Sequence, residues 1–257
     1  MNQTEKRMFL IRSLLDEQPQ YRNMKIPSDQ IGQRRLLRSL FNIRMPDVIS
    51  EDFLKVQDEY LQTELKEKGV TVLADLLPIE PGLYLWQGDI TTLSCDAIVN
   101  AANSGMTGCY QSCHNCIDNC IHTYAGIQLR NTCAKIMEKQ GYEEPTGQAK
   151  ITPAYNLPCK FVIHTVGPIV QGQMTRLHEE QLASCYRSCL ELGVANGVHS
   201  IAFCCISTGV FGFPQKRAAE IAVQTVREYR SKVHNAIEVI FNVFKDEDYK
   251  IYRDLLG

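Results

Sequence analysis

The sequence has no excess of charge of either sign and no long apolar run. Its 27 basic and 29 acidic residues are interspersed along 257 positions and give a formal net charge of −2, so it lacks the basic stripe that supplies nucleic-acid affinity. No segment approaches the roughly 18 consecutive apolar residues of a membrane span. Residues 1–15 mix charged with apolar side chains and contain no small-residue cleavage site. We therefore expect a cytoplasmic protein whose partners include neither nucleic acid nor membrane.

Internal repeats and low-complexity segments are also absent from the sequence. Hydrophobic residues make up 44% of it, which at this length suffices for one large core and a smaller additional element. Residues 1–75 are rich in charged and amide side chains, with apolar positions such as Phe9, Leu10 and Leu14 at near-helical spacing. We predict a helical N-terminal extension over residues 1–75 and one domain over residues 76–257.

From residue 83 onward, short β-branched and aromatic runs alternate with helical segments. The predicted strands cover residues 83–87, 97–99, 149–152, 161–164, 201–206 and 237–243. The predicted helices cover residues 117–138, 177–196, 214–230 and 247–255. Such alternation is typical of an α/β fold in which helices cover both faces of a mostly parallel sheet.

Cysteine, by contrast, is abundant. Eleven cysteines in a chain expected to stay in a reducing compartment indicate metal ligands or small core side chains rather than a disulfide framework. Residues 108–122 (GCYQSCHNCIDNCIH) place four thiols, two imidazoles and a carboxylate close together, and thiolate with imidazole is the ligand set that Zn²⁺ prefers. The cysteines outside this segment lie in apolar patterns and are predicted core residues: Cys95, Cys133, Cys159, Cys185, Cys189, Cys204 and Cys205.

The spacing of Cys109, His114 and Cys116 allows a loop to fold over one ion while the helix that begins near Cys116 supplies a fixed ligand. Three protein ligands leave a fourth position open, which is the arrangement of catalytic zinc. Cys113 is an alternative to one of the three ligands. Cys120, one turn after Cys116, either points at the metal or packs inward. The competing interpretation is that several buried cysteines merely lie near the start of a helix.

Three loops that follow predicted strands are candidate ligand sites, because ligands of open α/β sheets bind beyond the carboxyl ends of the strands. Asp89 in residues 88–91 suits an exocyclic amine such as that of adenine, although these four residues alone favour an ordinary turn or helix cap. Residues 207–214 combine two glycines with two hydroxyls before a helix N-terminus, which attracts phosphate, and the alternative is a structural turn. Residues 96–105 form a buried strand that ends in a polar loop whose small residues allow close approach to a ligand.

Two histidines near these loops are predicted to be structural. Asp118 and His122 are four residues apart and share a helix face, where His122 is expected to hydrogen-bond and pack. His164 lies within a predicted strand and is expected to be a satisfied core histidine.

Together, residues 88–91 (GDIT), 96–103 (DAIVNAAN), the Cys/His cluster up to Gly126, and 207–212 (STGVFG) resemble the macrodomain family in order and spacing. The resemblance covers roughly residues 75–257, and macrodomains bind ADP-ribose. The usual glycine run after the asparagine loop is replaced by residues 109–116, which is similar to the zinc-containing macrodomain branch of microbial pathogens. Members of that branch carry an N-terminal helical extension and remove ADP-ribose from protein. The resemblance implies a three-layer α/β/α fold with a mixed, mostly parallel sheet, and Zn²⁺ as cofactor.

The resemblance also implies roles for individual residues. Asp89 and the backbone of Ile90 would hold the adenine, and Asn100 and Asn103 would contact the distal ribose near the metal. The diphosphate would lie on the loop formed by Ser207, Thr208, Gly209, Val210, Phe211 and Gly212. Phe244, just past the last predicted strand, is placed to stack on the adenine ring, unless it only packs as strand-end aromatics commonly do.

The expected activity is hydrolysis of the bond between the distal ribose and an acidic side chain of a modified protein, with Asp118 and Asn103 as catalytic groups. Three roles of zinc stay open: activating water together with Asp118, positioning a ribose hydroxyl, or a structural clamp. The alternative functions are a non-catalytic ADP-ribose reader and a hydrolase of small esters such as O-acetyl-ADP-ribose. A lipoyl-carrier protein modified by a partner sirtuin is one candidate substrate that the resemblance suggests.

Overall fold

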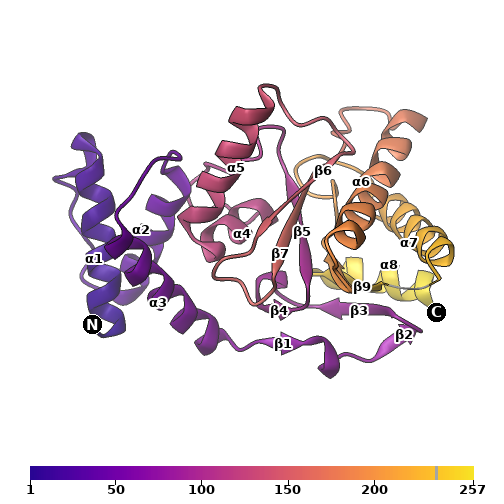
Figure 1. The fold of residues 1–257 in the computed structure, drawn as a ribbon, viewed down its shortest axis with the longest axis horizontal. Coiled ribbons are helices and arrows are strands. Elements are labelled where there is room, and N and C mark those ends of the chain that lie inside the picture. Colours follow the sequence, from indigo (N-terminus) through magenta and orange to yellow (C-terminus); the bar gives the residue numbers. More distant parts are fainter. Residues whose placement is uncertain (235–236) are drawn as a thin grey trace.

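The computed structural model describes residues 1–234 and 237–257. At its N-terminal end, helices α1 (Gln3–Glu17), α2 (Gln30–Ile43) and α3 (Glu51–Lys68) pack around a core of their own, with the short helix η1 (Pro19–Tyr21) after α1. Side chains of Asn2, Asp29 and Ser50 cap the first turns of these three helices, which explains where each begins. Figure 1 shows this bundle beside the larger α/β unit. The predicted helical extension is confirmed.

The α/β unit is built on one twisted sheet. In the described residues its strand order is β2-β3-β9-β8-β5-β7-β6. The strands are β2 (Pro78–Glu80), β3 (Leu83–Gln87), β5 (Ala97–Ala102), β6 (Ala149–Pro153), β7 (Phe161–Val166), β8 (Ser200–Phe203) and β9 (Glu238–Val243). The outer pairs β2–β3 and β6–β7 are antiparallel and the inner pairs are parallel. A separate parallel pair joins β1 (Thr71–Val72) to β4 (Leu93–Ser94).

Helices cover both faces of this sheet (Figure 1). One face carries α4 (Ile117–Ala125) and α5 (Ile127–Gln140), and the other carries α6 (Arg176–Ala195), α7 (Gln215–Lys232) and α8 (Asp246–Leu256). Side-chain contacts agree: Asn100 of β5 reaches Asp118 of α4, whereas the aromatic rings of Phe203 and Phe241 stack against Tyr186 and Tyr252 of α6 and α8. The predicted three-layer fold with a mixed, mostly parallel sheet is confirmed.

The single helix predicted over residues 117–138 is wrong, because the chain breaks it at Gly126. This residue has φ 95°, and a Cβ there would lie 2.6 Å from Nε2 of Gln57 in α3. The Asn156 side chain donates to the carbonyl of Ala125 at 3.0 Å and so satisfies the end of α4. The apolar pattern continues across the break, so periodicity alone did not reveal it. The strand predicted over residues 201–206 likewise ends earlier, at Phe203.

The cysteines outside residues 108–122 behave as core side chains, as predicted. Cys133, Cys159, Cys185, Cys189 and Cys204 are buried, and Cys95 and Cys205 are partly buried. All eleven cysteines have free thiols in the structure. Among the helices of the described residues, none combines the length and the apolar character needed to cross a membrane.

Candidate functional site

The loops singled out in the sequence meet at one edge of the sheet. β3, β9, β8, β5 and β7 are parallel neighbours, so their carboxyl ends lie together and the loops that follow them converge. Gly88 after β3 and Val243 at the end of β9 share a hydrogen bond of 3.0 Å, which joins two of these loops directly. The tertiary fold therefore brings together residues 88–92, 103–116, 204–213 and Phe244.

Asp118 is held by two asparagine amides at this edge. Nδ2 of Asn100 donates to Oδ1 of Asp118 at 2.8 Å, and Nδ2 of Asn103 donates to Oδ2 at 3.2 Å. Asp118 lies in the first turn of α4, where the helix dipole favours a negative charge. Burial nevertheless raises its pKa to about 6. The carboxylate is thus fixed in orientation and shielded from bulk water.

His164 forms a hydrogen bond with the Asn100 amide and helps to fix its orientation. Nδ1 of His164 lies 3.1 Å from Nδ2 of Asn100, and Nε2 lies 3.0 Å from Oγ1 of Thr152. Burial lowers the pKa of His164 to about 3, so the ring is neutral. Because the amide nitrogen can only donate, Nδ1 is the accepting nitrogen and Nε2 carries the proton. The prediction of a satisfied core histidine is confirmed.

His122 departs from the sequence-based expectation. Its ring is buried, and Nε2 lies 3.6 Å from Oδ1 of Asp118, but neither ring nitrogen has a hydrogen-bond partner among the described residues. Burial lowers its pKa well below the ordinary value. Gly108, with φ 85°, lies directly against this ring. A Cβ at this position would lie 2.8 Å from Cγ of His122, so only glycine allows the loop to pass this close. We therefore count His122, an unpaired buried imidazole beside Asp118, as part of the site. In the sequence, its spacing of four residues from Asp118 was the signal that could have indicated this.

Cys109, His114 and Cys116 form a group of possible metal ligands in the structure. Their ligand atoms all lie within 4.8 Å of one another, and Sγ of Cys109 is 3.6 Å from Nδ1 of His114. Burial raises the pKa of the Cys116 thiol to about 12, and a bound cation is what makes such a buried thiol a thiolate. All three residues are partly exposed, which leaves access for an ion and a further ligand. The donor set therefore fits Zn²⁺.

The other candidate ligands make different contacts. Sγ of Cys113 lies 3.4 Å from the carbonyl oxygen of Arg35, and Cys120 faces the guanidinium of Arg38 at 3.6 Å. A buried trio of His122, Cys133 and His164 also lies within 4.8 Å. Both nitrogens of His164 already have protein partners, so this trio matches a packed core better than a metal site.

Asp89 has the capping role that was the alternative considered for it, and its second oxygen faces a cation. Oδ1 accepts hydrogen bonds from the Thr91 backbone at 3.0 Å and the Thr91 hydroxyl at 2.6 Å, which caps the short helix η3 (Ile90–Thr92). Oδ2 lies 3.5 Å from Nζ of Lys68 at the end of α3. Nearby, Phe244 is 76% exposed, so its ring is open to a planar ligand. The arrangement suits a base that carries an exocyclic amine.

The loop after β8 presents unpaired donors. Ser207 and Gly212 have φ values of 65° and 69°, and the N–H of Phe213 closes the loop on the carbonyl of Ser207 at 3.0 Å. Within the described part of the chain, the N–H groups of Gly209 and Val210 donate to no acceptor. Oγ of Ser207 is buried and also unpartnered there. Free N–H groups before the N-terminus of α7 form a site for an anion such as a diphosphate.

The geometry agrees with comparisons to known proteins. The macro domain pattern matches residues 99–222, and a protein-ADP-ribose hydrolase of Treponema medium is 58% identical over 100% of both chains. This chain belongs to the macrodomain family. A protein-ADP-ribose hydrolase of Staphylococcus aureus strain MRSA252 is 48% identical, covering 96% of this macrodomain chain and 93% of its own. The prediction of a hydrolase is confirmed by these relatives.

A solved structure supports the same assignment. The Trypanosoma brucei macrodomain in complex with ADP-ribose superposes with a TM-score of 0.67 at 30% identity, covering 86% of this chain and 95% of that one. Because the Treponema alignment spans 100% of this macrodomain chain, that relative also has a segment corresponding to α1–α3.

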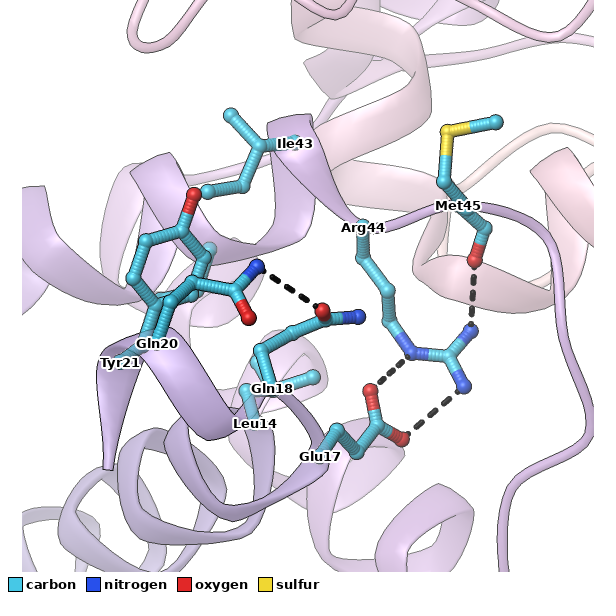
Figure 2. Close-up of a pocket in the computed structure, with 9 residues that line it drawn as sticks. Leu14, Glu17, Gln18, Gln20, Tyr21, Ile43, Arg44 and Met45 are labelled. Carbon is cyan, nitrogen blue, oxygen red and sulfur yellow. Dashed lines mark hydrogen bonds and ion pairs between the residues drawn. The ribbon is translucent and has the colours of Figure 1, made fainter.

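A hollow of about 180 Å³ lies in the N-terminal extension of this macrodomain, and none of the loop residues described above lines it (Figure 2). Arg44 lies at its edge, with Nε and Nη2 donating to the two carboxylate oxygens of Glu17 at 2.7 and 3.0 Å. The same guanidinium donates to the carbonyls of Met45 and Asp47. Through these hydrogen bonds Arg44 joins the end of α2 to α1, so we assign it a structural role.

Proposed function

We propose that this macrodomain is a zinc-dependent hydrolase that removes mono-ADP-ribose from acidic side chains of modified protein. The relatives named protein-ADP-ribose hydrolases support the activity, and the ADP-ribose complex of the Trypanosoma macrodomain supports the ligand. The single observation that carries the catalytic part is Asp118, held by two amides and two residues away from Cys116 of the possible metal group. A protein that only recognises ADP-ribose has no need of such a fixed buried carboxylate.

In this proposal water attacks the anomeric carbon of the distal ribose. The bond from that carbon to the side-chain oxygen breaks, the side chain leaves as a carboxylate, and Asp118 accepts the proton of the attacking water. Asn100 and Asn103 hold the two oxygens of Asp118 at 2.8 and 3.2 Å, which keeps the base aligned. His122 lies 3.6 Å from Asp118, and because burial lowers its pKa well below the ordinary value, its ring stays neutral and Asp118 keeps the role of proton acceptor.

Cys109, His114 and Cys116 would hold the zinc, which when bound supplies Lewis-acid stabilisation of charge beside the ribose. Adenine would lie between Asp89 and Phe244, and the diphosphate would meet the free N–H groups of the loop after β8.

We place the catalytic unit at residues 76–257, with residues 1–75 as its extension, in the cytoplasm. A lipoyl-carrier protein modified by a sirtuin is the candidate substrate to assay first.

The test combines metal analysis with turnover. We expect one zinc per chain, release of ADP-ribose from an aspartate- or glutamate-modified protein, loss of this release on chelation, and recovery when zinc is returned. ADP-ribose affinity, measured by calorimetry before and after chelation, serves as the control for an intact fold. Metal-free protein that binds ADP-ribose without releasing it from protein would instead identify a reader. Faster hydrolysis of O-acetyl-ADP-ribose than of any modified protein would point to the small ester as substrate.

Replacing Asp89 by asparagine is expected to weaken ADP-ribose binding about tenfold or more. A hydrogen bond to a charged acceptor contributes about 1.5–3 kcal/mol, and about 1.4 kcal/mol is a factor of ten. Asparagine retains an oxygen that caps η3, so the fold is preserved. Calorimetry with ADP-ribose and with its inosine analogue, which lacks the exocyclic amine, measures the effect. Equal losses for both ligands would show that Asp89 does not hold the amine.

A further inference from the structure

The loop that carries the metal group has little internal structure. Residues 103–116 connect β5 to α4 without a helix or strand, yet Cys109 and His114 must keep a fixed position for a metal to bind tightly. Cys113 in this loop has φ 52°, a strained conformation for a residue with a side chain, which persists only where surrounding contacts impose it. The source of that constraint lies in the N-terminal extension.

One face of α2 contacts three consecutive residues of this loop. Oγ of Ser39 lies 2.7 Å from Oγ of Ser112, and Oδ1 of Asn42 accepts the backbone N–H of Cys113 at 2.9 Å. Positions 35, 38, 39 and 42 are spaced three, four and seven residues from position 35, so they share one side of the helix. At the first of these positions, the backbone carbonyl oxygen of Arg35 accepts a hydrogen bond from the Cys113 thiol at 3.4 Å.

Arg38 links this face to a metal-ligand residue. Its Nη2 donates to the carbonyl oxygen of His114 at 2.7 Å and to Oδ1 of Asn119 at 3.1 Å. Asn119 lies in the first turn of α4 and donates its own backbone N–H to the thiol of Cys116 at 3.4 Å. A single guanidinium therefore ties the loop ligand His114 to the helix turn that carries Cys116.

Asn42 makes a second tie of the same kind. Its buried side chain accepts from the Cys113 N–H and donates to Oγ1 of Thr123 in α4 at 2.8 Å. Both residues thus bridge the loop of residues 103–116 and helix α4, and neither contacts the ligand atoms of Cys109, His114 and Cys116.

We propose that α2 is a positioning element of the metal site, in which Arg38 and Asn42 preorganise Cys109, His114 and Cys116 for the ion. The proposal rests on the zinc binding proposed above. It assigns to the N-terminal extension a part in building the active site, beyond its contribution to stability. Outer contacts that orient metal ligands typically change metal affinity by 10–100-fold when removed.

The test uses the full chain with Arg38→Ala and Asn42→Ala, separately. We expect zinc affinity, measured by competition with a chromophoric chelator, to fall about 10–100-fold in each variant. The absorption spectrum of the Co²⁺-substituted protein should change as well, because the ligand geometry loosens. ADP-ribose affinity should stay within about twofold, since the side chain of Asp89 is held by Thr91 and Lys68 and the loop after β8 closes on itself through Phe213 and Ser207.

Two further variants make the result decisive. Arg34→Ala on the same helix is the matched control, because Arg34 pairs with Glu64 and Glu67 inside the extension, and it should bind zinc as the unmodified chain does. Arg38→Lys keeps the charge with milder disturbance and should show an intermediate zinc affinity.

The outcomes separate this proposal from the proposed function. Unchanged zinc affinity and Co²⁺ spectrum in Arg38→Lys and Asn42→Ala, with only a lower melting temperature, would overturn it and leave α2 a structural support. An unmodified chain that binds no zinc would overturn both proposals at once.

Discussion

Asp118→Asn is expected to lower the rate constant kcat for ADP-ribose release by about 10²–10⁴-fold, the range that a positioned proton acceptor contributes. Asparagine keeps the size of the side chain and an acceptor for the Asn100 amide, but it cannot take a proton from water. ADP-ribose affinity is expected to stay within a few fold, because the adenine and diphosphate contacts are made elsewhere. Single-turnover kinetics on a modified protein, with calorimetry for binding, measures the two effects separately.

The matched control is Asp16→Asn, which removes an exposed carboxylate at the end of α1 and should leave both quantities unchanged. Loss of ADP-ribose binding in Asp118→Asn without a specific defect in kcat would contradict the catalytic role and assign Asp118 to the architecture of the site.

Arg130→Met is expected to lower the free energy of unfolding by about 3 kcal/mol or more, because a buried polar group left without its hydrogen-bond partner costs about 1–3 kcal/mol and Arg130 serves several such groups. The buried Nε of Arg130 donates to the carbonyl of Thr107 at 2.7 Å. Its Nη1 donates to the carbonyls of Phe41, Asn42 and Arg44 at 3.0, 2.8 and 2.6 Å. Methionine fills much of the volume and satisfies none of these acceptors, so each carbonyl stays buried without its donor.

Urea unfolding followed by circular dichroism measures this effect. Arg176→Met is the control, because Arg176 pairs with Glu180 on the surface, where its side chain is 89% exposed, and such pairs contribute about 0–1 kcal/mol. If Arg130→Met cost no more than Arg176→Met, the junction between α2, α5 and the loop of residues 103–116 would owe its stability to apolar packing alone.

The alternation of strands and helices in the sequence was enough to predict most of the fold. Apolar runs such as residues 97–99 are fully buried, and the polar residues that follow them mark the carboxyl edge where the loops meet. The break at Gly126 was not predictable from the apolar pattern, because it depends on the positive φ of Gly126 and on Gln57 of α3, whose Oε1 accepts the N–H of Ile127 at 3.0 Å. The place of His122 in the site was missed for a similar reason. Its spacing from Asp118 was visible, but the lack of a partner for its ring nitrogens depends on the loop that Gly108 places against it.

The sequence by itself determined the local chemistry: the amides of Asn100 and Asn103, the carboxylate of Asp118, and a thiol and imidazole set within eight positions of Cys109. Those groups lie close in the chain, so short-range spacing suffices to bring them together. Only the tertiary structure decided how α2 and Arg130 support the loop. Asn42 and Thr123 are 81 residues apart, and Arg130 and Arg44 are 86 apart, and a polar side chain carries no local signal of a distant carbonyl or amide that it will meet. That pairing is fixed by the packing of the two cores, which brings the extension against the site.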